Sequence, residues 1–354
     1  MNILSLASIN LEQLQHSMKS WGLPAFRAKQ ILDWRNKGIL DLSAMKNIPN
    51  SVKDALLEHI QVQPLKLVSK QKSTDGTRKY LFALQRDNQS LKHIETVFIP
   101  EESRGTVCIS SQAGCVLDCP FCHTGTQKFE GNLTAAEIMA QVLAVKYDLL
   151  QDPMKHDLHH KVTHIVYMGM GEPLANEVEV FQSLELLMAN DYLNLSRRRI
   201  TLSTSGLVPQ IERLGQDSPV NLAISLHTAI NEKRNTLVPI NIKHDLSRLR
   251  QCLNTYPLAK SRHITMEYVM LAGVNDRQED LDALVQFINP ERERINLIRF
   301  NSYPGSDYQG SATSVINNFA KSLISKGIRA TVRRSRGDDI MAACGQLKTA
   351  KQGL

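Results

Sequence analysis

The sequence predicts an α/β fold: an open, partial (β/α)6 barrel of the TIM-like kind, with a small N-terminal domain of helices and a β-hairpin. Two observations predict it. After residue 100, short runs of β-branched and aliphatic residues alternate with amphipathic helical segments, whereas the first 100 residues carry helical and then strand-like patterns. The composition, with 42% hydrophobic and 22% charged residues, is that of a folded globular protein. We expect an N-terminal domain over residues 1–100, the barrel over 101–345 and a tail over 346–354.

The N-terminal region changes its pattern near residue 62. Before that point the sequence shows short amphipathic stretches with helical spacing, and after it the pattern becomes strand-like. Two β-rich runs, 80–84 and 94–99, are joined across Asp87-Asn88. These runs form the expected hairpin.

Beyond residue 100, the alternation of strand and helix predicts parallel strands that are covered by helices. The expected strands span residues 106–111, 162–168, 199–203, 220–225, 264–271, 295–300 and 328–332. The expected helices include 134–150, 276–288 and 314–326, and the first of them opens with a Thr134/Glu137 capping box. Six or seven such units fall short of the eight in a complete TIM barrel, so a partial barrel is favoured. A doubly wound sheet is the alternative that alternation alone leaves open.

Charge and hydropathy limit the class of partner. The net charge of +7 and the pI of about 9.0 suit an anionic partner, either nucleic acid or a membrane surface, and charge alone does not separate the two. No apolar run approaches the roughly 18 residues of a membrane-spanning helix, and residues 1–12 lack the Lys or Arg of a secretory signal. We therefore expect a cytoplasmic protein without a membrane partner. In that reducing compartment, metal ligands or redox groups are a better interpretation of the six cysteines than structural disulfides.

Three cysteines stand close together in the loop between the first barrel strand and the first barrel helix. Cys115, Cys119 and Cys122 are separated by three and then two residues, so their thiolates can reach three corners of one small cluster. In a 4Fe-4S cluster held this way, the fourth iron lacks a protein ligand. It can chelate the amino and carboxylate groups of S-adenosylmethionine (SAM) and pass it an electron, which cleaves SAM to a 5′-deoxyadenosyl radical.

Three other kinds of site can also use cysteines in such a loop: a haem attachment, a zinc site and a redox pair. The segment from Cys119 to His123 matches the C-x-x-C-H haem-attachment pattern, but that chemistry belongs to exported proteins and leaves Cys115 unused. Zinc would need a fourth ligand such as His123, yet structural zinc sites usually pair two separated knuckles. A C-x-x-C redox pair would also leave Cys115 without a role. The spacing favours the cluster over these alternatives.

Polar residues follow several of the expected strands. Strand 162–168 leads into Gly169-Met170-Gly171-Glu172-Pro173, where the glycines let the backbone approach a ligand and Glu172 can bond an ammonium group. An exposed Glu in a Gly-Pro turn is an equally good interpretation of this motif alone. Other expected strands end in polar groups at Ser203, Ser225-Leu226-His227 and Asn301. Ligands of parallel α/β folds bind at the carboxyl ends of strands, so these groups together can bond a ribose or a carboxylate.

These motifs together resemble the RlmN/Cfr family of radical SAM RNA adenine methyltransferases. The resemblance runs from about Pro24 through Leu347. Its motifs are Phe26-Arg27-Ala28-Lys29-Gln30, Asp75-Gly76-Thr77-Arg78-Lys79, Gly114-Cys115 with Cys119 and Cys122, Gly169-Met170-Gly171-Glu172-Pro173-Leu174, Ser225-Leu226-His227, and Arg336-Gly337-Asp338-Asp339-Ile340 with Ala343-Cys344-Gly345-Gln346-Leu347. The resemblance implies a radical SAM barrel as the core, an N-terminal accessory domain that binds RNA, a 4Fe-4S cluster and two SAM molecules per turnover.

The resemblance also implies roles for single residues. One SAM would methylate Cys344, and the radical from a second SAM would remove a hydrogen from that S-methyl group. The methylene radical would add to an unreactive carbon of adenine, and Cys108 would attack Cys344 to release the product with a transient disulfide. Glu95 occupies the position of the family's proton acceptor. The family's SAM-contact positions correspond to Gly171, Glu172, Ser203, Ser225, Leu226, His227 and Asn301.

Without the resemblance, simpler interpretations hold for these residues. Cys108 lies in an apolar strand and Cys344 follows an apolar stretch, so both would be taken as core cysteines. Glu95 would be a solvated residue of a hairpin strand. Cys252 lies near an apolar helical stripe, and there we accept the core interpretation.

The substrate follows from the family branch. The carbon-2 branch methylates an adenine of 23S rRNA in the peptidyl-transferase centre and an adenine next to the anticodon of some tRNAs, and the other branch acts at carbon 8 of the same ribosomal adenine. Gly171-Glu172-Pro173 and the Arg336-Gly-Asp-Asp motif are closer to the carbon-2 branch. The chain departs from the common pattern at His123 and at Arg299-Phe300. A carbon-8 enzyme and a non-catalytic RNA- or ribosome-binding factor are the alternatives.

The implied partners are 23S rRNA, tRNA and an electron donor such as flavodoxin. Basic clusters that can bind RNA phosphates are Arg197-Arg198-Arg199 and Arg329, Arg333, Arg334 and Arg336. Each cluster taken separately is equally well explained as a solvated charged face.

Overall fold

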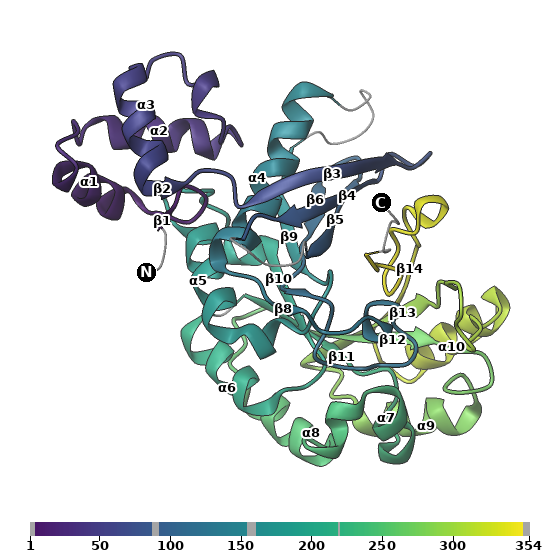
Figure 1. Cartoon of the computed structure of the whole chain (residues 1–354). Helices are drawn as coiled ribbons and strands as arrows, with labels where there is room; N and C mark the ends of the chain where they lie inside the picture. Colours follow the sequence, from purple (N-terminus) through teal and green to yellow (C-terminus); the bar gives the residue numbers. More distant parts are fainter. Residues whose placement is uncertain (1–3, 87–91, 154–160, 219, 350–354) are drawn as a thin grey trace.

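The computed structural model describes residues 4–86, 92–153, 161–218 and 220–349, and its centre is one curved ten-stranded sheet (Figure 1). Seven consecutive strands of this sheet are parallel, each pairing with the next along the chain. They are β6 (Gly105–Cys108), β9 (His164–Tyr167), β10 (Ile200–Thr204), β11 (Asn221–Ser225), β12 (Ile264–Met270), β13 (Glu293–Arg299) and β14 (Ala330–Arg333). Every strand expected after residue 100 is present.

Helices cover the outer side of the parallel strands, as the arc of helices in Figure 1 shows. They are α4 (Ala135–Gln151), α5 (Glu177–Met188), α6 (Val208–Asp217), α7 (Asn231–Leu237), α8 (Leu246–Thr255), α9 (Gln278–Phe287) and α10 (Thr313–Ser325). The expected capping box begins α4, since Thr134 Oγ1 accepts from the Glu137 N–H and Glu137 accepts from the Thr134 N–H. Sequential strand order and helices along one side confirm the partial barrel and exclude the doubly wound sheet.

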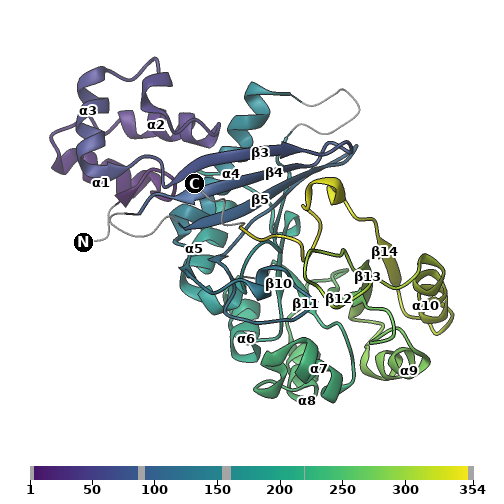
Figure 2. The ribbon, with the colours of Figure 1, turned by 45° about the vertical axis from the view of Figure 1, so that its right-hand side comes forward.

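The expected hairpin is present, and it continues the barrel sheet (Figure 2). Strands β3 (Leu65–Lys72), β4 (Arg78–Leu84) and β5 (His93–Pro100) are antiparallel neighbours, and β5 pairs with β6 so that Val97 lies opposite Cys108. Gly76, with φ +87°, makes the turn between β3 and β4. The expected connection at Asp87-Asn88 lies outside the described residues.

The N-terminal helices form a separate hydrophobic core. This unit contains β1 (Leu4–Ser5), α1 (Leu11–Ser20), α2 (Arg27–Asn36), α3 (Asn50–His59) and β2 (Ile60–Gln61). Buried side chains such as Leu14, Ile31 and Leu56 pack together here, whereas Tyr80 and Phe82 of β4 belong to the core of the barrel. The hairpin thus buries its apolar face with the barrel rather than with the N-terminal helices.

Short elements complete the chain. Two two-residue strands, β7 (Gln112–Ala113) and β8 (Gly131–Asn132), pair with each other beside the cysteine loop. The 3-10 helices are Leu42–Ala44, Thr124–Thr126, Pro173–Asn176, Arg197–Arg199, Pro239–Ile242 and Asp338–Ile340. Within the described ranges, no helix has both the length and the apolar character that a membrane span requires.

Candidate active site

A cavity of about 770 Å³ lies inside the barrel. Eleven of the thirteen residues expected at the site line it, namely Cys108, Cys115, Cys119, Cys122, Gly171, Glu172, Ser203, Ser225, His227, Asn301 and Cys344. They come from the ends of different strands, where the topology of a parallel barrel brings loops together. Leu226 and Glu95 are buried but are not part of the cavity wall.

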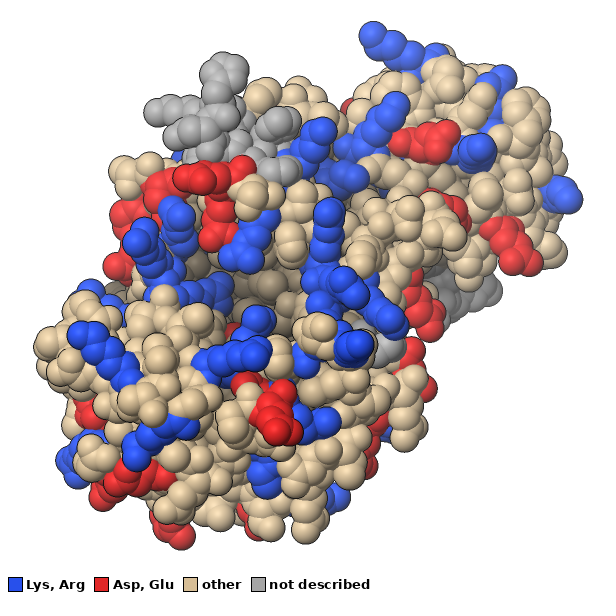
Figure 3. Space-filling model, turned by 180° about the vertical axis from the view of Figure 1, so that it is seen from behind, with Lys and Arg blue, Asp and Glu red and all other residues tan. Residues whose placement is uncertain are grey.

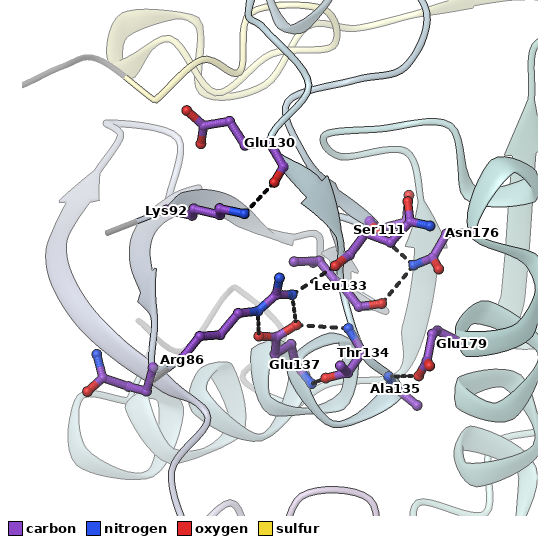
Figure 4. A network of polar contacts seen from close by, with 12 residues as sticks. Arg86, Lys92, Ser111, Glu130, Leu133, Thr134, Ala135, Glu137, Asn176 and Glu179 are labelled. Carbon is purple, nitrogen blue, oxygen red and sulfur yellow. Dashed lines mark hydrogen bonds and ion pairs between the residues drawn. The ribbon is translucent and has the colours of Figure 1, made fainter. Parts of the chain in front are cut away.

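The cysteine loop, residues 109–131, is fixed at both ends (Figure 4). The side-chain amide of Asn176 donates to the carbonyl oxygens of Ser111 (2.9 Å) and Leu133 (2.7 Å), which lie on the two sides of the loop. Arg86 forms an ion pair with Glu137 at the start of α4. A Cβ at Gly114 would lie 2.3 Å from the Lys128 carbonyl oxygen, so the loop closes tightly on itself only with glycine there.

The three cysteines of this loop are desolvated and close to one another. Burial raises the pKa of Cys115 to about 12 and raises the pKa values of Cys119 and Cys122 as well. The negative charge of Cys122 further raises the pKa of the other two. Thiolates become stable in such a site when cations accompany them, and iron provides that charge. The donor set therefore fits a cluster held by three cysteines.

A zinc site with His123 as the fourth ligand does not fit the geometry. The His123 ring stacks on Tyr303, with ring centroids 4.3 Å apart, and its Nδ1 lies 3.1 Å from the Gln346 carbonyl oxygen. Over the described residues, no three His, Cys, Asp or Glu side chains are close enough to share one metal ion. Three thiolates that each bind a different iron do not need to be that close.

Glu172 is buried, with 3% of its surface exposed, and is not the exposed turn residue of the simpler interpretation. Its Oε2 accepts from the Ser205 N–H at 2.8 Å and its Oε1 accepts from the Leu174 N–H at 3.1 Å. Burial raises the pKa of this carboxyl, and these hydrogen bonds partly oppose the rise. A buried carboxylate that lines a cavity is suited to bind an ammonium group.

His227 presents a neutral imidazole to the cavity. Its Nδ1 accepts from the Val269 N–H at 3.1 Å, which assigns the ring proton to Nε2. Burial, helped by the charge of Arg234, lowers the pKa of His227 to about 3. The nearby hydroxyls of Ser203 and Ser225 are 3.5 Å apart. The wall therefore offers an N–H and two hydroxyls for polar groups of a ligand.

The guanidinium of Arg333 interacts with both Cys108 and Cys344 through their charges. Burial raises the pKa of Cys108 to about 12, with the charge of Cys344 adding to the rise and Arg333 opposing it. The charge of Cys344 is also the main cause that raises the pKa of Arg333. Asn301 donates weakly to the Cys344 carbonyl oxygen at 3.4 Å and accepts from the Ser335 hydroxyl at 2.7 Å. Both cysteines are free thiols in the structure.

Glu95 contacts the segment that carries Cys344. Its Oε1 is 3.3 Å from Lys79 Nζ, and its Oε2 accepts from the Lys348 N–H at 3.1 Å. Burial raises the pKa of Glu95, and the charge of Lys79 opposes that rise. The residue is 5% exposed, so the solvated interpretation is wrong.

Two arginines of the site were not found as such from the sequence. Arg234 is fully buried and donates to the carbonyl oxygens of Leu226 (3.1 Å), Ser205 (2.7 Å) and Ser225 (3.1 Å), so it joins the ends of two strands. No motif surrounds it in α7. The sequence predicted Arg333 only as a phosphate contact. Its position beside Cys108 and Cys344 depends on how the strands curve around the cavity, which no local pattern shows.

The two departures from the family pattern meet in space. His123 stacks on Tyr303, and Phe300 packs edge-on to the same ring with centroids 6.2 Å apart. Phe300 also lines the cavity. The two positions are therefore one aromatic cluster beside the Cys344 segment rather than two independent changes.

The basic residues divide between the two ends of the barrel. Arg333, Arg334 and Arg336 follow the carboxyl end of β14 and line the cavity. A second set lies at or just before the amino ends of strands, and two of its members, Arg199 and Arg294, also line the cavity. The set consists of Arg197, Arg198, Arg199, Arg262, Arg294 and Arg329. We call this second set the amino-end arginines. Seen from the side opposite to Figure 1, Lys and Arg side chains gather around a hollow in the surface (Figure 3).

Comparison with known proteins identifies the family and the fold. Residues 109–288 match the radical SAM superfamily, and residues 2–62 match the ribosomal RNA large subunit methyltransferase N-terminal domain. The chain is 45% identical to the dual-specificity RNA methyltransferase RlmN of Parvibaculum lavamentivorans, over 97% of this chain and 89% of that protein. It is 46% identical to the protein of that name from Rhodopseudomonas palustris, over 93% and 84%. A radical SAM methyltransferase from Sphaerobacter thermophilus has the same fold, with a TM-score of 0.90, 36% identity and coverage of 97% and 98%.

Proposed function

This chain belongs to the RlmN family of the radical SAM superfamily, and we propose that it methylates carbon 2 of adenine in RNA. Its substrates in this proposal are 23S rRNA, in the peptidyl-transferase centre, and the adenine next to the anticodon of some tRNAs. The observation that carries the proposal is the meeting of the three-cysteine loop, Cys108 and Cys344 on one cavity. A protein that only binds RNA needs none of these thiols.

The enzyme uses a 4Fe-4S cluster and SAM, with two SAM molecules per turnover. Cys115, Cys119 and Cys122 would hold the cluster, and Glu172 would bind the SAM ammonium group. When bound, the cluster and SAM supply a radical that can remove hydrogen from an unactivated methyl group. The chain itself provides the cavity and the neutral His227, whose Nε2–H would donate to the ligand.

The methyl group would travel on Cys344. Carbon 2 of adenine is not a nucleophile, so polar transfer from SAM to that carbon is not available, whereas a thiolate accepts a methyl group readily. Arg333 lies beside Cys344, and the charge of that cysteine is the main cause that raises the pKa of Arg333. After the methylene carbon has bonded to carbon 2, that position would lose a proton to Glu95 and one electron to the redox chain that supplied it, which restores the aromatic ring. Cys108 would then attack the sulfur of Cys344 as a thiolate, so that the S–S bond forms as the S–CH2 bond breaks. The electron pair of the broken bond would leave with the carbon, which takes up a proton to become the methyl group of the released RNA.

RNA would approach the cavity along the basic residues at its rim. Arg333, Arg334 and Arg336 lie where phosphates of a bound strand would pass. The N-terminal helices add Arg27 and Lys29, which fits an accessory role in RNA binding. We expect the enzyme to act in the cytoplasm with its RNA, and to receive electrons from a small redox protein such as flavodoxin.

Nucleoside mass spectrometry tests this function. RNA from cells that lack the gene is expected to lose 2-methyladenosine from both 23S rRNA and tRNA, and the purified enzyme with SAM and a chemical reductant is expected to restore it. Persistence of 2-methyladenosine in cells without a second copy of the gene would contradict the assignment. Formation of 8-methyladenosine instead would identify a carbon-8 enzyme.

A further inference from the structure

Lys79 of β4 makes two contacts at the edge of the active site. Only 12% of its side chain is exposed, and its Nζ lies 3.3 Å from Glu95 Oε1 on the neighbouring strand β5. The same ammonium donates to the Met341 carbonyl oxygen, also at 3.3 Å. Met341 precedes Cys344 by three residues, so one cation contacts both the acidic residue and the segment that carries the thiol.

The other side of the Cys344 segment is also bound to this pair. Glu95 Oε2 accepts from the backbone N–H of Lys348, four residues after Cys344. Lys79 and Glu95 together therefore hold the segment on both sides of Cys344. Between these points, the Gly345 carbonyl oxygen accepts from the His123 N–H at 2.8 Å, which fixes the segment to the cysteine loop.

We propose that Lys79 is a positioning residue that holds the Cys344 segment and the Glu95 carboxylate in register through a single ammonium group. The inference rests on the proposed function, in which Cys344 carries the methyl group and Glu95 accepts a proton. An ammonium has three donors, so it can bond a carboxylate and a carbonyl oxygen at once. One of these contacts joins β4 to β5, and the other joins β4 to the segment near the end of the chain.

Few charged groups face Glu95. Lys79 approaches it from β4, and the C-terminal segment contributes the backbone N–H of Lys348. His123 of the cysteine loop lies near Lys79 and Lys348, but burial lowers its pKa and it carries no charge at neutral pH. Burial raises the pKa of Glu95, and Lys79 is the main influence that lowers it. Without Lys79, the carboxyl would keep its proton to a higher pH and would be unable to accept another.

Three substitutions separate the two contacts. Lys79→Met removes both, Lys79→Gln keeps a donor for the Met341 carbonyl oxygen but removes the charge beside Glu95, and Lys79→Arg keeps the charge. Lys70→Met is the matched control, because Lys70 of the neighbouring strand β3 forms a similar ion pair with Asp148 of α4 (2.6 Å), away from the cavity. Iron content shows whether each variant folds and assembles. The reactions use a chemical reductant and measure the rates of Cys344 methylation and of 2-methyladenosine formation from pH 6 to pH 9.

Lys79→Met is expected to form 2-methyladenosine more slowly at pH 7, and its pH–rate profile should lie about a unit or more toward alkaline pH, since an opposite charge this close shifts a pKa by that amount. Its rate should recover as the pH rises, because the carboxylate form of Glu95 then returns. Lys79→Gln should show the same pH dependence with nearly normal Cys344 methylation. Lys79→Arg and Lys70→Met should stay within about twofold of the wild type.

Three results would overturn the inference. A Lys79→Met enzyme that matches the wild type at every pH would show that the ammonium is not needed. A loss that is equal at every pH and is not restored in Lys79→Arg would show a purely structural role. An unshifted pH profile in Lys79→Gln would show that the charge of Lys79 does not affect proton acceptance by Glu95. Failure of the wild type itself to make 2-methyladenosine would instead contradict the proposed function, and Cys344 methylation would still report on the segment.

Discussion

The two ends of the barrel carry opposite kinds of polar group. At the carboxyl ends of the strands, thiols, a carboxyl and an imidazole are buried, and burial is the main cause that shifts their pKa values. At the amino ends, five of the six amino-end arginines are exposed, and in the described part of the chain none of the six forms an ion pair with a carboxylate. Groups suited to chemistry are thus buried at the carboxyl end, whereas basic residues suited to binding occur at both ends.

The sixth member of the set makes the contrast clear. The pKa of Arg262 is lowered by partial burial and by the charges of Arg198, Arg197 and Arg294, so the cluster repels itself. A polyanion relieves such repulsion, whereas water only screens it. The cavity is lined by Arg199 and Arg294 at this end as well as by the cysteines at the other, so it connects the two ends. We expect changes at the carboxyl end to abolish reaction steps, and changes at the amino end to alter RNA affinity.

The largest effect is expected for the cluster ligands. Cys119→Ala should abolish cluster binding and lower 2-methyladenosine formation by about a thousandfold or more, because the radical can no longer form. Iron analysis and nucleoside mass spectrometry measure the two effects. Cys252→Ala is the control, since Cys252 is buried in α8 beside Leu249 and Leu253, and it should keep full iron. Normal iron in Cys119→Ala would contradict the site.

Variants of the two remaining site cysteines should lose activity at different reaction steps. Cys344→Ala removes the methyl carrier, so neither a methylated cysteine nor methylated RNA should form. Cys108→Ala leaves the carrier in place but removes the thiol that releases the product, so RNA should stay covalently attached to Cys344. Denaturing gel electrophoresis separates the two outcomes. Free methylated RNA from either variant at the wild-type rate would contradict the assigned order of steps.

A smaller effect is expected at Glu172. Glu172→Gln keeps the shape of the side chain but loses the charge, and a hydrogen bond to a charged group contributes about 1.5–3 kcal/mol. The dissociation constant for SAM should therefore rise by roughly tenfold to a hundredfold, while the iron content stays normal. In the wild type, SAM affinity should fall as the pH drops through the raised pKa of Glu172, because only the carboxylate binds the ammonium group. Unchanged SAM affinity in the variant would exclude this contact.

The smallest effect is expected at the amino end. Replacing Arg197 and Arg198 by Gln should leave the rate on a short RNA hairpin unchanged. On long RNA, it should reduce the salt dependence of binding by about one unit of slope for each lost phosphate contact. A double Gln variant of two exposed residues, Lys321 of the outer helix α10 and Lys326 directly after it, matches the change in charge and should bind RNA like the wild type. An unchanged slope in the arginine variant would show that this end is only a solvated face.

The sequence predicted the barrel well because its strands and helices alternate locally, and each expected strand is present. The hairpin strands were also identified, but their continuation of the barrel sheet was not. That arrangement depends on the pairing of β5 with β6 and on the apolar face of β4, and no local pattern distinguishes a separate hairpin from one that extends a sheet.

The site was predicted to the extent that it follows strand ends and motifs. Glu172 and the three clustered cysteines are marked by glycines and by spacing, and eleven of the thirteen expected residues line one cavity. Arg234 and Lys79 were missed as site residues, because each acts through contacts that join distant parts of the chain. Lys79 and Met341 are 262 positions apart, and only the folded structure brings them together.

In the proposed reaction Cys344 carries the methyl group as an intermediate, and isotopic labelling distinguishes this route from direct transfer. SAM with a fully deuterated methyl group is supplied to the enzyme with unlabelled RNA, and the 2-methyladenosine formed is analysed by mass spectrometry. Because one deuterium is removed from the S-methyl group of Cys344 before the carbon bonds to adenine, the new methyl group should contain two deuterium atoms. A product that retains all three would mean intact transfer and would contradict the account.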